Sequence, residues 1–175
     1  MKRITPLLLV LLACTALLHG EEGSSQPRPK DEANAWKVKV GDPAPNFTST
    51  TLGGKLIKLA NLLGSPVIVN FTSTGSPACK ANTLKLVEIE AKYRDQGLKI
   101  MSVYLDTANK NVRMYEKTLG ANWPVNQDGK ILDNAAALNY GVSVIPTNVL
   151  VGKDGNILVL DLSDAQMDAE IQKAL

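Results

Sequence analysis

The sequence predicts an α/β domain in which a mixed central β-sheet carries helices on both faces. In the first half, short apolar runs rich in β-branched residues alternate with longer amphipathic segments, a pattern typical of parallel strands joined by crossover helices. Near the C-terminus, two further strand-like runs flank Lys153-Asp154-Gly155-Asn156, and an Asp-Gly pair favours a tight hairpin between antiparallel strands. With 45% hydrophobic and 21% charged residues among 175, the chain has enough apolar material for one core.

The first half of this domain predicts two strands, each followed by a helix. Val67-Ile68-Val69-Asn70-Phe71 is a β-branched run of the kind found in buried strands, and residues 98–105 form a second such run. Residues 76–94 and 109–119 predict helices, because their apolar side chains recur at the spacing of one helical face. Those apolar positions are Leu84, Val87, Ile89, Tyr93, Val112, Tyr115 and Leu119.

The second half predicts a helix, a hairpin and a closing helix. The helix is expected at 131–140, where Gly141 ends it. Strands at 148–151 and 157–162 form the two sides of the hairpin. Residues 164–175 close the chain as an amphipathic helix. Its apolar face consists of Met167, Ile171 and Leu175.

The distribution of charge excludes one class of partner. The chain carries 19 basic and 17 acidic residues, and the excess comes from Lys2 and Arg3, so residues 21–175 hold 17 of each. A neutral body argues against a nucleic-acid partner held by phosphate contacts.

Histidine and cysteine are equally informative, because His19 and Cys14 both lie in the first twenty residues. The rest of the chain has one thiol, Cys79, and no imidazole. This excludes a Ser-His-Asp triad, a Cys-His pair, a His-ligated zinc site and an internal disulfide. We therefore expect no metal ion and no cofactor.

The chain begins with a predicted signal peptide at residues 1–20. A short positive segment, Met1-Lys2-Arg3, precedes an apolar run that is too short to span a membrane. Leu11-Leu12-Ala13-Cys14 resembles a bacterial lipobox, in which the cysteine becomes the lipidated N-terminus. Ordinary cleavage near Gly20 would instead discard Cys14, and both interpretations remain open. Either one predicts an extracytoplasmic protein, in the periplasm or cell envelope.

Residues 21–40 and 41–175 differ in composition. Residues 21–39 are polar and rich in Glu, Ser, Pro and Lys, so 21–40 is predicted to be a tether. Residues 41–175 have the length of one domain.

Four motifs in this domain carry a resemblance to a known family. Gly41-Asp42-Pro43-Ala44-Pro45-Asn46-Phe47 resembles the opening of extracytoplasmic thioredoxin-like proteins of the TlpA/ResA type and of the broader AhpC/TSA redoxin group. The run from Val69 to Cys79 is similar to the strand and helix start that carry their W-C-x-x-C motif. Gly141 to Thr147 resembles the segment with their cis-proline, and Asp154-Gly155 their terminal hairpin. The resemblance implies a thioredoxin-like fold and thiol–disulfide oxidoreductase activity without a cofactor.

The sequence departs from this family where the chemistry occurs. Gly75 stands where the family has tryptophan, Ser76 where it has the nucleophilic cysteine, and Asn82 where it often has a glutamate. Cys79 matches the second, resolving cysteine. Dithiol exchange needs two thiols, and the hydroxyl of Ser76 replaces neither, so the chain cannot complete the family's reaction unaided. Ser76 before Pro77 is also a good helix N-cap, which would accept the N–H of Cys79.

Two alternatives to a thiol–disulfide oxidoreductase stay open. Peroxiredoxins share the fold and end their motif in T/S-x-x-C, which Ser76 and Cys79 match, so a one-cysteine peroxidase is one alternative. Thr72 replaces the proline of that motif, and no arginine lies near Pro146. The other alternative is a redox-silent domain that binds extracytoplasmic peptides or proteins.

The expected binding residues follow from the resemblance. In the family, the backbone beside the cis-proline pairs with an extended peptide, which implies that Ile145, Pro146 and Thr147 bind substrate. Asp106 and Trp123-Pro124 follow strands near the same edge and are further candidates. A partner thiol would be required if Cys79 is reactive.

Overall fold

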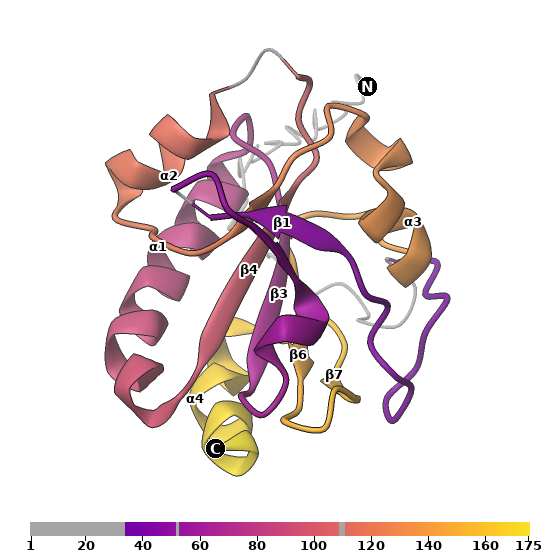
Figure 1. Ribbon diagram of the computed structural model, residues 1–175, viewed down its shortest axis with the longest axis vertical. Coiled ribbons are helices and arrows are strands. Elements are labelled where there is room, and N and C mark those ends of the chain that lie inside the picture. Colours follow the sequence, from indigo (N-terminus) through magenta and orange to yellow (C-terminus); the bar gives the residue numbers. More distant parts are fainter. Residues whose placement is uncertain (1–33, 52, 109–110) are drawn as a thin grey trace, which may run out of the picture.

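A seven-stranded sheet forms the centre of the computed structural model, which describes residues 34–51, 53–108 and 111–175 (Figure 1). The strand order is β2-β1-β5-β4-β3-β6-β7. The strands are β1 Thr48–Thr50, β2 Leu56–Lys58, β3 Val67–Thr72, β4 Lys99–Tyr104, β5 Val125–Asn126, β6 Thr147–Val151 and β7 Ile157–Val159. The α-helices are α1 Pro77–Tyr93, α2 Val112–Leu119, α3 Ala135–Tyr140 and α4 Asp164–Ala174. Three short 3₁₀ turns lie at Leu59–Leu62, Arg94–Gln96 and Ile131–Asp133.

The sheet is mixed, as the sequence predicted. The pairs β3–β4 and β4–β5 are parallel, because helices return the chain to the same end of the sheet. The pairs β3–β6 and β6–β7 are antiparallel, and Asp154-Gly155 forms the predicted hairpin between β6 and β7. Gly155 has φ +87°, a backbone conformation that glycine adopts without steric cost.

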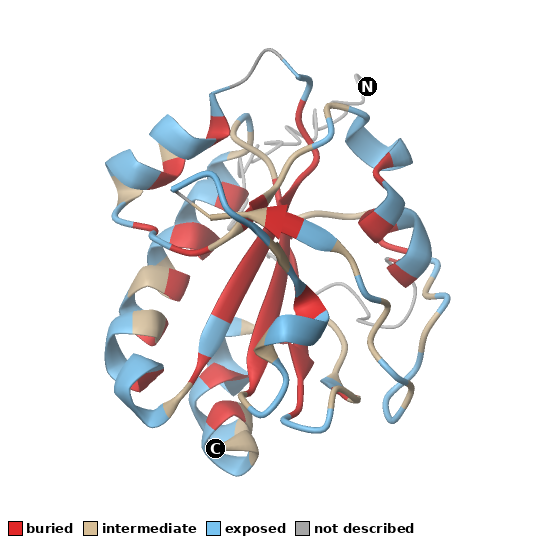
Figure 2. Cartoon of the chain, viewed as in Figure 1, coloured by how far each residue is buried: buried red, intermediate tan, exposed pale blue. Residues whose placement is uncertain are grey.

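Helices cover both faces of the sheet, and this confirms the prediction from the sequence. On one face, α1 and α4 pack over Ile68, Ile100 and Leu150. On the other face, α3 packs over the alternate side chains of the same strands, such as Val69 and Phe71. Figure 2 shows this as central strands that are buried, apart from the exposed first residue of β4, and helices that are buried only where they meet the sheet.

Four elements differ from the sequence predictions: three short strands and one helix. Strands β1, β2 and β5 were not predicted, because each has only two or three residues and little apolar patterning. The single helix expected at 131–140 is divided in two at Asn134. The side chain of Asn134 accepts hydrogen bonds from the N–H groups of Ala136 and Ala137, and so starts α3 as an N-cap.

The described part of the predicted tether, residues 34–40, lies against the domain. Trp36 and Val38 pack on the core beneath α3, and Asn34 is only 8% exposed. The folded unit therefore begins before Gly41. The predicted signal peptide and Cys14 lie outside the described residues. Within the described ranges, no helix combines the length and hydropathy that a bilayer-spanning segment needs.

Candidate functional site

Ser76 starts helix α1 at the C-terminal end of strand β3. Its backbone is extended, with φ −107° and ψ 124°, and its Oγ accepts the N–H of Cys79 at 3.3 Å. Pro77 occupies the first helical position, where its missing N–H is not needed. The predicted N-cap is therefore confirmed, and Ser76 already has a structural role as a capping residue.

Cys79 lies in the first turn of α1 and is fully buried. The hydroxyl of Tyr115, on α2, lies near both Cys79 and Asp106. The pKa of Tyr115 is raised, first by burial and then by the negative charge that Cys79 and Asp106 carry when ionised.

Asp106 holds the loop that leads into α1. One carboxyl oxygen accepts the N–H of Thr74 at 2.9 Å, and the other accepts the hydroxyls of Thr74 at 2.8 Å and Ser73 at 3.4 Å. Asp106 lies two residues after the end of β4, the strand next to β3. It therefore fixes the loop Ser73–Ser76 from a neighbouring part of the sheet. The sequence placed Asp106 near this edge but did not indicate this role.

Beneath α1, buried amides form a hydrogen-bonded group. The Nδ2 of Asn70 donates to the Oδ1 of Asn82 and of Asn148, each at 2.8 Å. Asn82 is thus tied to the sheet by a neutral contact. On the neighbouring strand β4, Ser102 Oγ accepts a hydrogen bond from the indole of Trp123 at 2.6 Å. Trp123 is itself buried, so it is a core residue and not part of a binding surface.

A second acid, Glu116 on α2, lies fully buried behind this group. Burial raises its pKa to about 8, although the nearby hydroxyls of Tyr104 and Ser102 and the indole of Trp123 act in the opposite direction. None of these donors reaches hydrogen-bond geometry, and both carboxyl oxygens lack a partner among the described residues. Sequence reasoning missed Glu116, because a glutamate on an amphipathic helix is usually solvent-exposed.

The predicted binding residues lie on a loop at residues 143–147, whose last residue, Thr147, begins β6. The Ile145–Pro146 peptide bond is cis, as the resemblance implied. Thr147 pairs with Phe71 of β3, so this loop and the Ser73–Ser76 loop meet at the same end of the sheet. Ile145 and Pro146 are half-buried and present an accessible edge, whereas Thr147 is buried. The structure thus brings Ser76, Cys79 and the Ile145–Pro146 edge together at one end.

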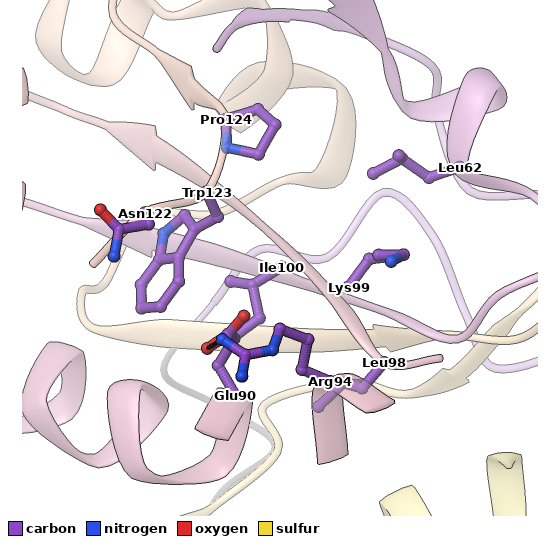
Figure 3. Close-up of a pocket in the computed structure, with 9 residues that line it drawn as sticks. All are labelled: Leu62, Glu90, Arg94, Leu98, Lys99, Ile100, Asn122, Trp123 and Pro124. Carbon is purple, nitrogen blue, oxygen red and sulfur yellow. Dashed lines mark ion pairs between the residues drawn. The ribbon is translucent and has the colours of Figure 1, made fainter. Parts of the chain in front are cut away.

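The described pockets lie away from these residues. One pocket of about 170 Å³ is formed where the C-terminal half of α1 meets β4 and the loop before β5 (Figure 3). Glu90 and Arg94, which form an ion pair at 3.8 Å, line it together with Trp123. Cys79 is at the opposite end of the same helix. Among the described residues, no cluster of His, Cys, Asp and Glu could hold a metal ion.

Comparison with known proteins decides the family. The family model described as Redoxin matches residues 39–175. The chain belongs to the redoxin family. The thiol-disulfide oxidoreductase ResA of Bacillus anthracis is 33% identical over 128 residues, which cover 72% of this chain and 71% of ResA. ResA of Bacillus subtilis strain 168 is 30% identical over 128 residues, with 72% and 69% covered.

A solved structure gives the same result for the fold. A candidate thiol:disulfide interchange protein DsbE from Chlorobium tepidum superimposes with a TM-score of 0.69 at 25% identity, over 78% of this chain and 98% of that chain. This redoxin is therefore a thioredoxin-like protein of the TlpA/ResA type, in the thiol–disulfide oxidoreductase class. The recognition of the family from its four motifs is confirmed.

Proposed function

We propose that this redoxin binds extracytoplasmic polypeptides at the Ile145–Pro146 edge and has lost the dithiol cycle of its class. One observation carries the proposal: of the two positions in the first turn of α1 that would hold a dithiol, one is the capping hydroxyl of Ser76 and the other is a fully buried thiol. The chain can still offer the binding edge, because Ile145 and Pro146 remain accessible beside this turn.

The chemistry of a single thiol supports this proposal. If Cys79 attacked a substrate disulfide, one sulfur of the substrate would leave as a thiolate and the other would stay bonded to Cys79. Release of the substrate would then need a second thiol, supplied by another molecule. Full reduction of a disulfide transfers two electrons, and one thiol of this chain supplies only half of them.

The geometry favours this proposal over the peroxidase alternative. A peroxidatic thiolate needs access to peroxide and a neighbouring cation. Cys79 is fully buried, which restricts the access of peroxide to its sulfur.

Substitution of Ser76 by cysteine tests the lost cycle. Ser76 and Cys79 lie three positions apart in the first turn of α1, the spacing at which two cysteines of a helix start can form a disulfide. We expect Ser76→Cys to form an intrachain disulfide with glutathione disulfide and to reduce insulin, while the parent does neither. Ser76→Ala is the matched control, because it also removes the cap but adds no thiol.

Two outcomes would contradict the proposal. Catalytic insulin reduction by the parent would show that the cycle is intact. If Ser76→Cys keeps two free thiols after treatment with glutathione disulfide, positions 76 and 79 are not placed to form a disulfide.

The location is proposed on similar grounds. Similarity to ResA and DsbE proteins supports an extracytoplasmic location, and the positive segment and apolar run of residues 1–20 support export. Lipidation of Cys14 would anchor the protein to a membrane, and cleavage near Gly20 would release it. The mass of the mature N-terminal peptide from the native host distinguishes these two outcomes.

A further inference from the structure

Asn34 is an unusual residue at the start of the described chain, because it is buried and makes three hydrogen bonds to one loop. Its Oδ1 accepts the N–H of Ser143 at 2.9 Å and the N–H of Val144 at 2.8 Å. Its Nδ2 donates to the Oγ1 of Thr147 at 3.2 Å. These partners lie on both sides of Ile145 and Pro146, the two residues of the proposed binding edge.

Thr147 closes the loop from within. Its hydroxyl donates to the carbonyl oxygen of Val144 at 2.8 Å and accepts from Asn34 at the same time. One asparagine and one threonine thereby fix the chain before and after the Ile145–Pro146 bond. Because all these groups are buried or half-buried, each hydrogen bond restricts the loop more than a solvent-exposed one would.

The backbone that follows Asn34 is held just as closely. The N–H of Lys37 donates to the carbonyl oxygen of Tyr140 at 3.1 Å. A Cβ at Gly141 would lie 2.1 Å from the carbonyl oxygen of Ala35, so only glycine lets the segment pass so close to α3. Trp36 then packs against the core. Residues 35–37 are therefore fixed at several points, and the chain that follows Asn34 keeps its side chain at the loop.

We propose that residues 34–37 form a clamp, in which Asn34 is a positioning residue that holds loop 143–147 in the shape that binds an extended polypeptide. Loss of Asn34 leaves the fold intact, but it releases the N–H groups of Ser143 and Val144. The clamp deepens the proposed function, because it acts on the same binding edge.

Amide hydrogen exchange in the full chain tests the clamp independently of any activity. We expect Asn34→Ala to speed exchange at Ser143 and Val144 by roughly ten- to thirtyfold, while Val149 in β6 is unchanged. Asn34→Asp keeps an acceptor oxygen, so it should preserve most of the protection. Lys37→Ala, an exposed side chain in the same segment, is the matched control and should change nothing.

A second measurement asks whether the clamp matters for binding. In a Ser76→Cys background, the reduced dithiol transfers two electrons to a disulfide and becomes a disulfide itself. Adding Asn34→Ala should slow the reduction of insulin by about three- to tenfold through a higher KM, because a polypeptide must dock on the loop. Reduction of hydroxyethyl disulfide, which has no polypeptide to dock, should be unchanged. Asn34→Asp should restore most of the insulin rate.

The outcomes separate the two proposals. Unchanged exchange at Ser143 and Val144 in Asn34→Ala would overturn the clamp, as would an equal loss with insulin and with hydroxyethyl disulfide. If Ser76→Cys reduces neither substrate, positions 76 and 79 do not form the dithiol site of the class, and the proposed function fails. The exchange measurement still decides whether Asn34 fixes the loop.

Discussion

Two neighbouring regions of this redoxin differ in how many of their buried hydroxyl and carboxyl oxygens have a hydrogen-bond partner. Around loop 143–147, the side chains of Asn34 and Thr147 find hydrogen-bond partners on both sides of Pro146. Between α1, β4 and α2, by contrast, a set of buried oxygens has no partner among the described residues. These oxygens belong to Thr72, Thr83, Tyr104, Tyr115 and Glu116.

The difference indicates where order has been kept. Buried polar groups are normally paired, and an unpaired one costs free energy. The hydrogen bonds of Asn34 and Thr147 therefore preorganise the loop, whereas the unpaired oxygens behind Cys79 carry an energetic cost. This agrees with the proposal that the protein retains the binding edge of its class and has lost the dithiol cycle.

Of the substitutions that test this comparison, Glu116→Gln should change the free energy of unfolding, and its dependence on pH, the most. The folded carboxyl has a pKa of about 8, against 4.5 in the unfolded chain, so the folded state retains a proton that the unfolded state releases. Its contribution to stability is complete below pH 4.5 and is lost as pH rises through 8. At about 1.4 kcal/mol per pKa unit, the parent should lose up to roughly 5 kcal/mol over this interval.

Urea unfolding from pH 5 to pH 9 measures that loss. Glu116→Gln should show a much flatter profile, and Glu88→Gln, a change at an exposed position of α1, should follow the parent. Parallel profiles for parent and Glu116→Gln would mean that Glu116 is not buried as a neutral acid.

Asp106→Ala should have the next largest effect. It removes three hydrogen bonds that order Ser73 and Thr74, at a cost of about 2–3 kcal/mol. Asp95→Ala, at a residue with a 92% exposed side chain, should stay within about 0.5 kcal/mol of the parent. Thermal or urea unfolding compares the two, and equal effects would show that Asp106 does not organise the loop.

One substitution made in both regions tests the contrast directly. Thr147→Val removes a hydroxyl that both donates and accepts, and should destabilise the fold by about 1–2 kcal/mol. Thr83→Val removes a buried hydroxyl without a partner among the described residues, so it should be neutral or stabilising. If urea unfolding gives both variants the same loss, the contrast between the regions is wrong.

Ser76→Ala should have the smallest effect, a loss of about 1 kcal/mol, because it removes one helix cap. It should also let α1 fray, so that Cys79 in the native protein reacts several times faster with a thiol reagent. No change in either measurement would mean that the N-cap does not protect the thiol.

Local sequence signals predicted much of the fold. The β-branched run at 67–71 and the Ser76-Pro77 cap act through neighbouring residues, so both were visible in the sequence. The short strands β1 and β5 depend on pairing with each other, at Thr50 and Val125, which no local pattern reveals.

The candidate site shows the same limit. Ser76, Cys79 and Pro146 were found from motifs, but the contacts of Asn34 cross more than one hundred positions in the chain. Glu116 was missed because its burial depends on how α2 packs, not on its neighbours. The 131–140 segment was predicted as one helix because the capping role of Asn134 competes with its place in an apolar pattern.

The positions of Asn34 and Leu175 have a consequence for how the Ile145–Pro146 edge is presented when the domain is attached by one end. Asn34 contacts the loop of the binding edge. The C-terminus lies at the other end of the sheet (Figure 1), and Lys153, in the β6–β7 hairpin, donates to the carbonyl oxygen of Leu175. Thr147 begins strand β6 and Lys153 follows its other end, Val151, which is about 13 Å away along the strand. A domain attached through residue 34 would have the edge on its attached side, and one attached through Leu175 would have it on the far side. The end chosen for attachment therefore selects which partners can reach Pro146.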